Sequence, residues 1–113
     1  MIKAGKVFKV KDENEIIDGC TVSLEDIKGV IYFSLAKNTD ISPETYRDKK
    51  ILFVNYGGAS AYNKNFSKQL NEGQAVIINE DIPLGVKTQT GAIYTELTIR
   101  RDSKMNGIIK DGN

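Results

Sequence analysis

Short apolar runs with a period of two dominate the chain and predict β-strands. The alternation predicts strands over residues 2–10, 20–24, 30–37, 51–56, 75–78 and 92–101, with a hairpin arm over 84–87. Polar stretches with Gly or Pro separate these runs and mark turns. In the loop over residues 38–49, Ser42 followed by Pro43 predicts one helical turn.

One segment changes period. Tyr62, Phe66 and Leu70 recur every four residues among polar neighbours, which predicts an amphipathic helix over residues 59–70 with Gly73 as its stop signal. On this helix Tyr62 and Phe66 would plug the core. Reduced to its main elements, the predicted order is three strands, one helix and two strands.

Composition indicates one folded domain, over residues 1–101, and a mobile tail over residues 102–113 that lacks periodicity. Of the 113 residues, 40% are hydrophobic and 27% are charged, which is ordinary for a globular domain. Sixteen basic and fifteen acidic side chains give a net charge of +1. A nucleic-acid partner would therefore require the basic residues to gather on one face.

Several chemistries are excluded or disfavoured by residue counts. The chain has no His and one Cys, Cys20, which rules out a His-based catalytic triad and a zinc site of His and Cys ligands. The composition leaves a Ser–Lys dyad or a carboxylate pair open but favours binding over catalysis, so we expect no enzyme, no metal and no cofactor. A single Cys also fits a reducing compartment, and the sequence shows no signal peptide and no apolar run of membrane-spanning length. The expected location is the cytoplasm.

Four blocks resemble, in order, the bacterial and bacteriophage single-stranded DNA-binding protein family. The second-strand signature of that family is small-apolar-x-Phe-Ser-Leu-Ala, and its third strand ends in an aromatic residue and glycine. A Leu-x-x-Gly-x-x-Val step and a Gly-x-x-Tyr-Thr-Glu-Val entry into the last strand follow. The matching segments here are residues 30–36, 51–57, 70–77 and 90–97.

The resemblance implies an all-β OB-fold, which is a five-stranded Greek-key barrel with a helix between strands three and four. It implies sequence-tolerant binding of single-stranded DNA in replication or recombination, a homodimer or homotetramer, and contacts with replication or recombination proteins. The chain lacks tryptophan and the family's acidic carboxy-terminal tip. Both departures suggest a phage-encoded member of the family.

Binding a single strand requires aromatic rings on which bases stack and cations that follow the phosphates. Strand parity predicts Ile31, Phe33 and Leu35 inside the barrel and Tyr32 outside. It also predicts Ile51 and Phe53 inside with Lys50, Leu52 and Val54 outside, and Ile93, Thr95, Leu97 and Ile99 inside with Tyr94, Glu96 and Arg100 outside. The resulting nucleic-acid-binding candidates are Tyr32, Tyr56, Tyr94, Phe8 and Tyr46, with Lys6, Lys37, Lys49, Lys50, Lys87 and Arg100 as cations.

Two other interpretations fit the same pattern. The near-neutral charge and the missing tryptophans also suit an OB-type module for protein interaction or assembly that binds no nucleic acid. An OB domain that binds RNA is the third interpretation. All three interpretations place function on one outer face of a closed sheet.

Overall fold

A computed structural model of the chain describes residues 2–100, without the side chain of Asp26. The predicted tail over residues 102–113 lies outside these residues. The elements are α1 (Val10–Glu13), β1 (Thr21–Ile27), β2 (Val30–Leu35), β3 (Thr39–Glu44), β4 (Lys49–Asn63), β5 (Phe66–Asn71), β6 (Ala75–Ile78), β7 (Leu84–Thr88) and β8 (Ala92–Ile99). The strand predictions over residues 30–37, 51–56, 75–78, 84–87 and 92–101 correspond to β2, β4, β6, β7 and β8.

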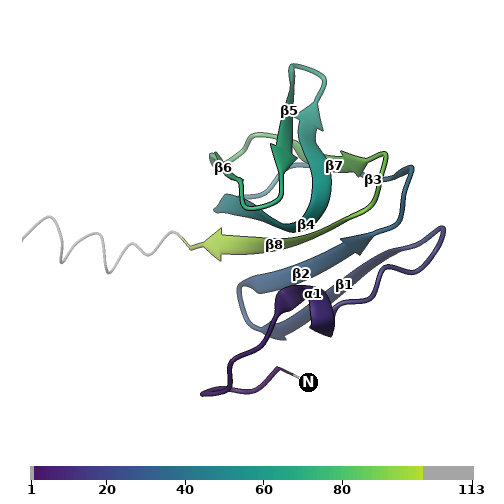
Figure 1. Cartoon of the computed structure of the whole chain (residues 1–113). Coiled ribbons are helices and arrows are strands. Elements are labelled where there is room, and N and C mark those ends of the chain that lie inside the picture. The colour runs from purple at the N-terminus through teal and green to yellow at the C-terminus, as the bar shows by residue number, and fades with distance from the viewer. Residues whose placement is uncertain (1, 101–113) are drawn as a thin grey trace, which may run out of the picture.

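Two antiparallel sheets curl around one core and share the long strand β4 (Figure 1). Sheet A contains β1, β2, β8, the first part of β4, and β6. Sheet B contains β3, β7, the second part of β4, and β5. Because β4 passes from one sheet into the other, the apolar side chains of both sheets meet in the space that it encloses.

The turn of β4 from sheet A to sheet B occurs at residues 55–57. The pairing with β8 slips between Val54 and Tyr56, so that Asn55 is an extra residue. Gly57 follows with a φ of 74°, a conformation that residues with a side chain rarely adopt. A Cβ atom at Gly57 would overlap the Gly91 carbonyl oxygen. The bulge and the glycine together let the two backbones meet where the strand bends.

This topology overturns the predicted five-stranded Greek-key OB barrel. The described residues form eight strands in the order β1-β2-β8-β4-β7-β3, with β5 and β6 each paired to β4. The all-β part of the fold prediction is confirmed. The error arises because alternating apolar strands meet the packing requirements of many antiparallel barrels, whatever their strand order.

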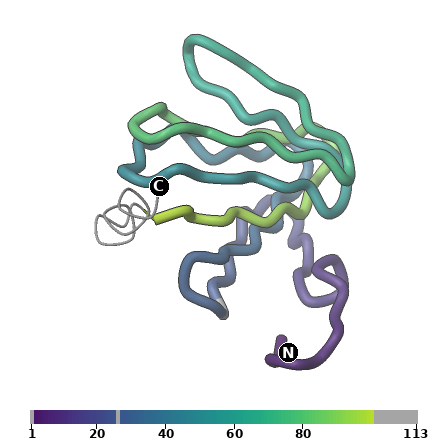
Figure 2. Tube along the Cα trace, turned by 90° about the vertical axis from the view of Figure 1, so that its left-hand side faces the viewer, coloured from purple at the N-terminus to yellow at the C-terminus, as the bar shows by residue number. Residues whose placement is uncertain are grey.

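The predicted helix over residues 59–70 is wrong. This segment is the hairpin of β4 and β5, in which Ala59 pairs with Leu70 and Asn63 pairs with Phe66. Figure 2 shows the hairpin at the opposite end of the molecule from the N-terminal segment. A spacing of four residues is also a multiple of two, so Tyr62, Phe66 and Leu70 satisfy a strand pattern as well as a helical one.

The Asn63 side chain organises this hairpin. Its Oδ1 accepts hydrogen bonds from the backbone N–H of Asn65 (2.7 Å) and Phe66 (3.2 Å). Its Nδ2 donates to the Pro83 carbonyl oxygen at 2.7 Å. The side chain therefore closes the turn and ties it to the segment before β7.

Replacing Asn63 with alanine should lower the free energy of unfolding by about 1–2 kcal/mol, since three hydrogen bonds are lost at a partly exposed site. Urea denaturation measures the change. Asn65→Ala is the matched control, because the Asn65 side chain bonds no described residue. Equal effects of the two substitutions would contradict the assigned role of Asn63.

The predicted first strand over residues 2–10 and the helical turn at Ser42–Thr45 are also wrong. Residues 2–9 form no strand, and α1 begins at Val10. The N-terminal segment lies beside β1 and β2 in Figure 1, and the Phe8 ring meets the Tyr32 ring edge-on at 6.3 Å. Ser42 and Pro43 lie within β3, an edge strand, where Pro is tolerated.

The outer face of sheet A carries an apolar row. Ile77, Ile51, Leu97, Val30 and Ile27 occupy paired positions on five consecutive strands. The row is 60% exposed at Ile77 and 55% exposed at Ile27. Parity predicted Ile51 and Leu97 inside the barrel, and this prediction is wrong because both faces of these strands carry apolar side chains. Within residues 2–100 no helix has the length and apolar character needed to cross a membrane.

Candidate functional site

The inward faces of β4 and β8 meet in register inside the barrel. Tyr94 of β8 pairs with Val54 of β4, and Thr98 pairs with Lys50. Because side chains alternate along a strand, Glu96 points inward between Tyr94 and Thr98. The buried core around these strands is otherwise formed by Leu, Ile, Val and Ala side chains. The inward-facing side chains of β4 and β8 therefore include polar groups surrounded by an apolar interior.

Lys50 is the centre of the polar cluster, which we define as Tyr46, Lys50, Tyr94, Glu96 and Thr98. The Lys50 Nζ donates to Glu96 Oε2 at 3.2 Å and to Thr98 Oγ1 at 2.8 Å. It also lies 4.4 Å from the centroid of the Tyr46 ring, which is the geometry of a cation–π contact. The ammonium group is thus held by three different side chains.

Both charges of this ion pair are buried. Lys50 is 7% exposed and Glu96 is 4% exposed. Removing two charges from water costs free energy that their mutual attraction often fails to recover, and apolar residues of similar size are frequently as stabilising. A buried pair is therefore weak evidence for a purely structural role. We therefore regard this end of the barrel as a candidate functional site.

Two polar atoms of the cluster are left without a protein partner. Glu96 bonds Lys50 through Oε2 alone, and the Tyr94 hydroxyl bonds no described residue. Nevertheless, no fully enclosed side-chain oxygen or nitrogen of the described residues lacks a hydrogen bond. Glu96 Oε1 and the Tyr94 hydroxyl are therefore reached by solvent. A small molecule entering the barrel would find one acceptor and one donor available.

The two tyrosines of the cluster remain protonated far above neutral pH. Burial, the hydrogen bond to Glu44 and the negative charge of Glu96 raise the pKa of Tyr46 from its usual 10.0 to about 12. Burial and the charge of Glu96 raise the pKa of Tyr94 well above its usual value. The Tyr94 hydroxyl is therefore a hydrogen-bond donor at every physiological pH.

Tyr46 should ionise near pH 12 in the folded protein, and Tyr46→Phe should remove that step from the tyrosinate absorbance titration. Because the folded pKa is raised, the protonated form is the one that the fold favours. Its contribution to stability is complete below about pH 10 and is lost as the pH rises from there to about 12. Loss of an absorbance step near pH 10 in the variant would contradict this assignment.

A hollow of about 380 Å³ lies at the tip of the β4–β5 hairpin, and no residue of the polar cluster lines it. Its apolar wall consists of Phe66, Ile77, Ile78, Ile82 and Pro83, and Asn63, Asn65 and Asn79 complete the lining. Ile78 lies directly beside Lys50 in the β4–β6 ladder, with both side chains buried. We call the polar cluster, with Ile78 beside it, the barrel mouth. The hollow is in the size range of small-molecule sites.

The structure separates the aromatic residues that the sequence brought together. Tyr32 is on the outer face, as predicted, but is 6% exposed, and Tyr94 is inside the barrel at 1%. Tyr46 packs against the core beside Lys50. Tyr56 is outside and 38% exposed beneath Lys11, whose Nζ is 4.6 Å from its ring centroid. Phe8 packs edge-on against Tyr32, so among these five rings only Tyr56 is classed as exposed.

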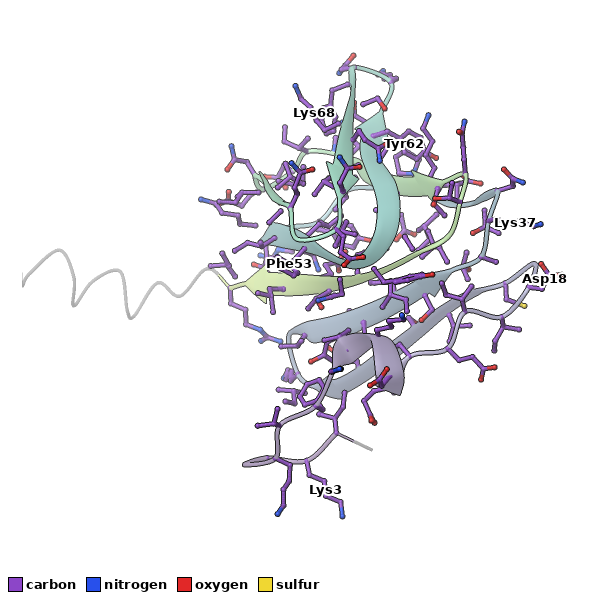
Figure 3. The ribbon with its side chains drawn as sticks, viewed as in Figure 1. Lys3, Asp18, Lys37, Phe53, Tyr62 and Lys68 are labelled. Atoms are coloured by element: carbon purple, nitrogen blue, oxygen red, sulfur yellow. The ribbon has the colours of Figure 1, made fainter. Side chains whose placement is uncertain are left out.

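The predicted cations do not follow one track either. Lys50 is buried in the cluster, and Lys87 lies on sheet B with its Nζ 4.6 Å from the Tyr62 ring centroid. Lys49 begins β4 with partial burial. Lys6 is in the N-terminal segment, Lys37 follows β2, and Arg100 follows β8, all three exposed. Figure 3 shows Lys37 projecting from the end of β2, well separated from Phe53.

Sequence reasoning selected Tyr46, Lys50 and Tyr94 for a different surface and missed Glu96 and Thr98 as site residues. The available signal was a charged residue at each of two positions, Lys50 and Glu96, beside strands that are otherwise apolar. Within residues 2–100 no three His, Cys, Asp or Glu side chains are grouped so that they could hold a metal ion. The chemistry of the mouth thus comes from hydroxyl, carboxylate and ammonium groups.

This two-sheet barrel has the cupin, or double-stranded β-helix, fold. A conserved protein of unknown function, SPY1581 from Streptococcus pyogenes, is 17% identical with a TM-score of 0.81, over 90% of this chain and 93% of its own. A cupin superfamily protein from Desulfitobacterium hafniense is 12% identical with a TM-score of 0.78, over 88% and 95%. A Klebsiella pneumoniae protein with a double-stranded β-helix domain is 13% identical with a TM-score of 0.69, over 83% and 89%.

Some neighbours of the same fold carry names of enzymes. The polyketide cyclase RemF from Streptomyces resistomycificus is 15% identical with a TM-score of 0.56, over 61% of this chain and 51% of its own. A predicted oxalate decarboxylase from Thermotoga maritima is 8% identical with a TM-score of 0.59, over 64% and 65%. No family model and no curated protein matches the chain. At these identities the likeness establishes the fold alone.

The resemblance to single-stranded DNA-binding proteins is therefore wrong. The structural neighbours are cupin-type barrels, and the predicted base-stacking rings are buried or dispersed. This correction also removes the basis for a DNA-binding function, for a phage replication or recombination role and for a DNA partner. The OB-type interaction module and the replication partners lose their basis for the same reason. The homo-oligomer was implied by that resemblance alone and loses its basis.

Proposed function

We propose that this chain is a small-molecule-binding protein of the cupin fold and that its ligand binds in the barrel mouth. The observation that carries the proposal is the pair of unbonded polar atoms, Glu96 Oε1 and the Tyr94 hydroxyl, on side chains more than nine-tenths buried. Solvent reaches both atoms, so a ligand can replace water as their hydrogen-bond partner. A ligand that bonds both atoms would complete the polar cluster.

Two further features support this function. The mouth sets a few polar groups against the apolar core of the barrel, which is the usual composition of a small-molecule site. Lys50, Tyr94, Glu96 and Thr98 also come from β4 and β8, which exchange the largest set of paired residues in the two sheets. Rigid strands hold such groups in place more accurately than loops do.

The test is a fragment screen by ligand-observed NMR, followed by mapping of amide shifts in the ¹⁵N-labelled protein. We expect bound fragments to shift the amides of Ile78, Tyr94 and Glu96. Tyr94→Phe should weaken binding by about fivefold to tenfold through the loss of one hydrogen bond. Tyr62→Phe is the control, because Tyr62 lies on the outer face of sheet B and bonds Asp40. Shifts confined to other surfaces would overturn the proposal.

A second candidate function is an enzyme that converts the bound molecule. Glu96 favours it, since a carboxylate with one unbonded oxygen in a water-poor site can take or return a proton. The enzyme names among the fold neighbours support this candidate. Following each fragment hit by NMR over hours tests it: conversion that disappears in Glu96→Gln supports an enzyme, and unchanged ligand supports binding alone.

The proposed setting of either function is a reducing compartment, the cytoplasm. Cys20 is exposed and unpaired in the described structure, and proteins of oxidising compartments more often pair their cysteines. Labelling of Cys20 by a membrane-permeant maleimide in intact cells, with no labelling by an impermeant one, would support this location. Labelling by the impermeant reagent would contradict it.

A further inference from the structure

A polar groove of about 320 Å³ lies on the outer face of sheet B, apart from the barrel mouth. Ala59 and Ala61 of β4 are buried in the core, so Ser60 between them points outward. Gln69 of β5 and Lys87 of β7 pair with Ser60 in the ladders on its two sides, and directly paired residues share a face. The groove therefore crosses β5, β4 and β7, and no residue of the polar cluster lines it.

Gly58 keeps the floor of this groove open. Its φ lies outside the left-handed region, so the backbone there is accessible to residues that carry a side chain. A Cβ atom at Gly58 would come within 3.1 Å of Gln69 Nε2 and 3.5 Å of the Leu70 carbonyl oxygen. The glycine therefore provides space between β4 and the Gln69 side chain rather than a special backbone conformation.

Hydrogen bonds within the protein hold the walls of the groove in place. Ser60 Oγ donates to Gln69 Oε1 at 2.9 Å and so orients the amide of Gln69. Thr88 Oγ1 donates to the Gly58 carbonyl oxygen at 2.6 Å and accepts from the Gly91 N–H at 3.0 Å. These bonds fix the turn after β7 against the bend of β4. A groove with fixed walls loses little freedom when a ligand binds.

The free hydrogen-bonding groups of the groove include both donors and acceptors. The Gln89 amide and the Thr90 hydroxyl line the groove and bond no described residue. Ser60 Oγ and Gln69 Oε1 each keep an acceptor lone pair beyond their mutual bond. A ligand hydroxyl both donates and accepts, so it can bond any of these groups.

The one charged side chain that lines the groove is Lys87, and its ammonium group lies over a ring outside it. Lys87 Nζ is 4.6 Å from the centroid of the Tyr62 ring, and Tyr62 does not line the groove. Asp40 lies opposite Lys87 in the β3–β7 ladder and accepts a hydrogen bond from the Tyr62 hydroxyl at 3.0 Å. The groove therefore favours ligands that bring no charge of their own.

We propose that this groove is a second binding site and that it takes uncharged, hydroxyl-rich molecules of the size of one monosaccharide unit. Its volume is in the range of small-molecule sites. An apolar ligand would displace water from the free amide and hydroxyl groups without replacing its hydrogen bonds, which costs free energy. A sugar ring replaces those bonds with its own hydroxyls.

Five probes of similar ring size separate hydroxyl content from charge. They are the methyl glycosides of glucose and galactose, the methyl glycosides of the corresponding uronic acids, and cyclohexanol. Their affinities for the full chain are measured at pH 7 by the amide shifts of Ser60, Gln69 and Gln89. We expect at least one neutral glycoside to bind about tenfold tighter than cyclohexanol, because it forms more hydrogen bonds. The uronates should bind no tighter than their neutral counterparts.

Two variants test the groove itself with the neutral glycoside that binds tightest. Gln89→Ala should weaken its binding by about fivefold to tenfold through the loss of the amide. Asn65→Ala is the matched control, since it removes an exposed amide that does not line the groove, and it should leave the affinity unchanged. Gly58→Ala should weaken binding by about tenfold, because the Cβ atom displaces Gln69. Circular dichroism and thermal unfolding establish that each variant is folded.

Three results would overturn the proposal. The site is wrong if no neutral glycoside shifts the groove amides, or if Gln89→Ala and Asn65→Ala bind the glycoside equally well. The ligand class is wrong if cyclohexanol or a uronate binds tighter than both neutral glycosides. Because the groove and the barrel mouth share no residue, these results leave the fragment test of the mouth unaffected.

Discussion

Replacing Lys50 with methionine should lower the free energy of unfolding by about 3–5 kcal/mol, because Glu96 is left charged and buried without its partner. Few single substitutions in this chain should cost as much. Urea denaturation at pH 7 measures the loss.

The double variant Lys50→Met with Glu96→Leu is the control for that prediction. Both charges are then absent, and apolar side chains of similar length fill the space between β4 and β8. We expect it to recover most of the stability, because a well-packed apolar pair often equals or exceeds a buried ion pair. If the double variant were as unstable as Lys50→Met, the cost would arise from packing rather than from the unpaired charge.

Replacing Gly57 with alanine should lower the free energy of unfolding by about 2–5 kcal/mol. The residue has a φ of 74°, which costs about 1–2 kcal/mol for a residue with a Cβ atom. The added Cβ atom would also overlap the backbone at Gly91, and forced backbone shifts in packed regions cost about 1–3 kcal/mol more. The substitution would strain the bend that carries β4 from sheet A to sheet B.

Gly73→Ala separates the two contributions. Gly73 has a φ of 87° but no neighbouring atom lies within 4 Å of its Cβ position. Alanine there should cost only the conformational part, about 1–2 kcal/mol. Equal losses for Gly57→Ala and Gly73→Ala in urea denaturation would show that close backbone approach at Gly91 does not define the bend.

The strands could be predicted from the sequence, whereas their connections could not. Period-two alternation located β2, β6, β7 and β8 to within a few residues, because each has apolar side chains on at least one buried face. The hairpin of β4 and β5 was mistaken for a helix because Tyr62, Phe66 and Leu70 satisfy both periods. The turn between them contains no Gly that would have marked it.

The assignment of faces on β4 failed at one residue. Parity placed Lys50, Leu52, Val54 and Tyr56 on one outer face, whereas the extra residue Asn55 puts the first three inside and Tyr56 outside. A bulge reverses parity for every residue on one side of it. Nothing in the sequence of Val54, Asn55 and Tyr56 marks its position, so grouping Lys50 with the outward-facing Tyr56 placed Lys50 on the wrong face.

The resemblance to single-stranded DNA-binding proteins failed for a related reason. Its blocks combine alternating apolar residues with glycines at turns, such as Gly57 and Gly91, and a Tyr-Thr-Glu segment in the last strand. Antiparallel barrels of different topology need these same features at strand ends. Strand order depends on pairings between residues far apart in the chain, such as Lys50 with Ile78 and Lys49 with Ile99, which no local pattern encodes.

A crystal structure of the chain with the fragment that binds tightest most directly tests the claim that the barrel mouth is the ligand site. We predict that the fragment bonds Glu96 and the Tyr94 hydroxyl, with the Lys50–Glu96 ion pair intact. A fragment bound only on the outer faces of the sheets, with Glu96 and Tyr94 still unbonded, would contradict the account.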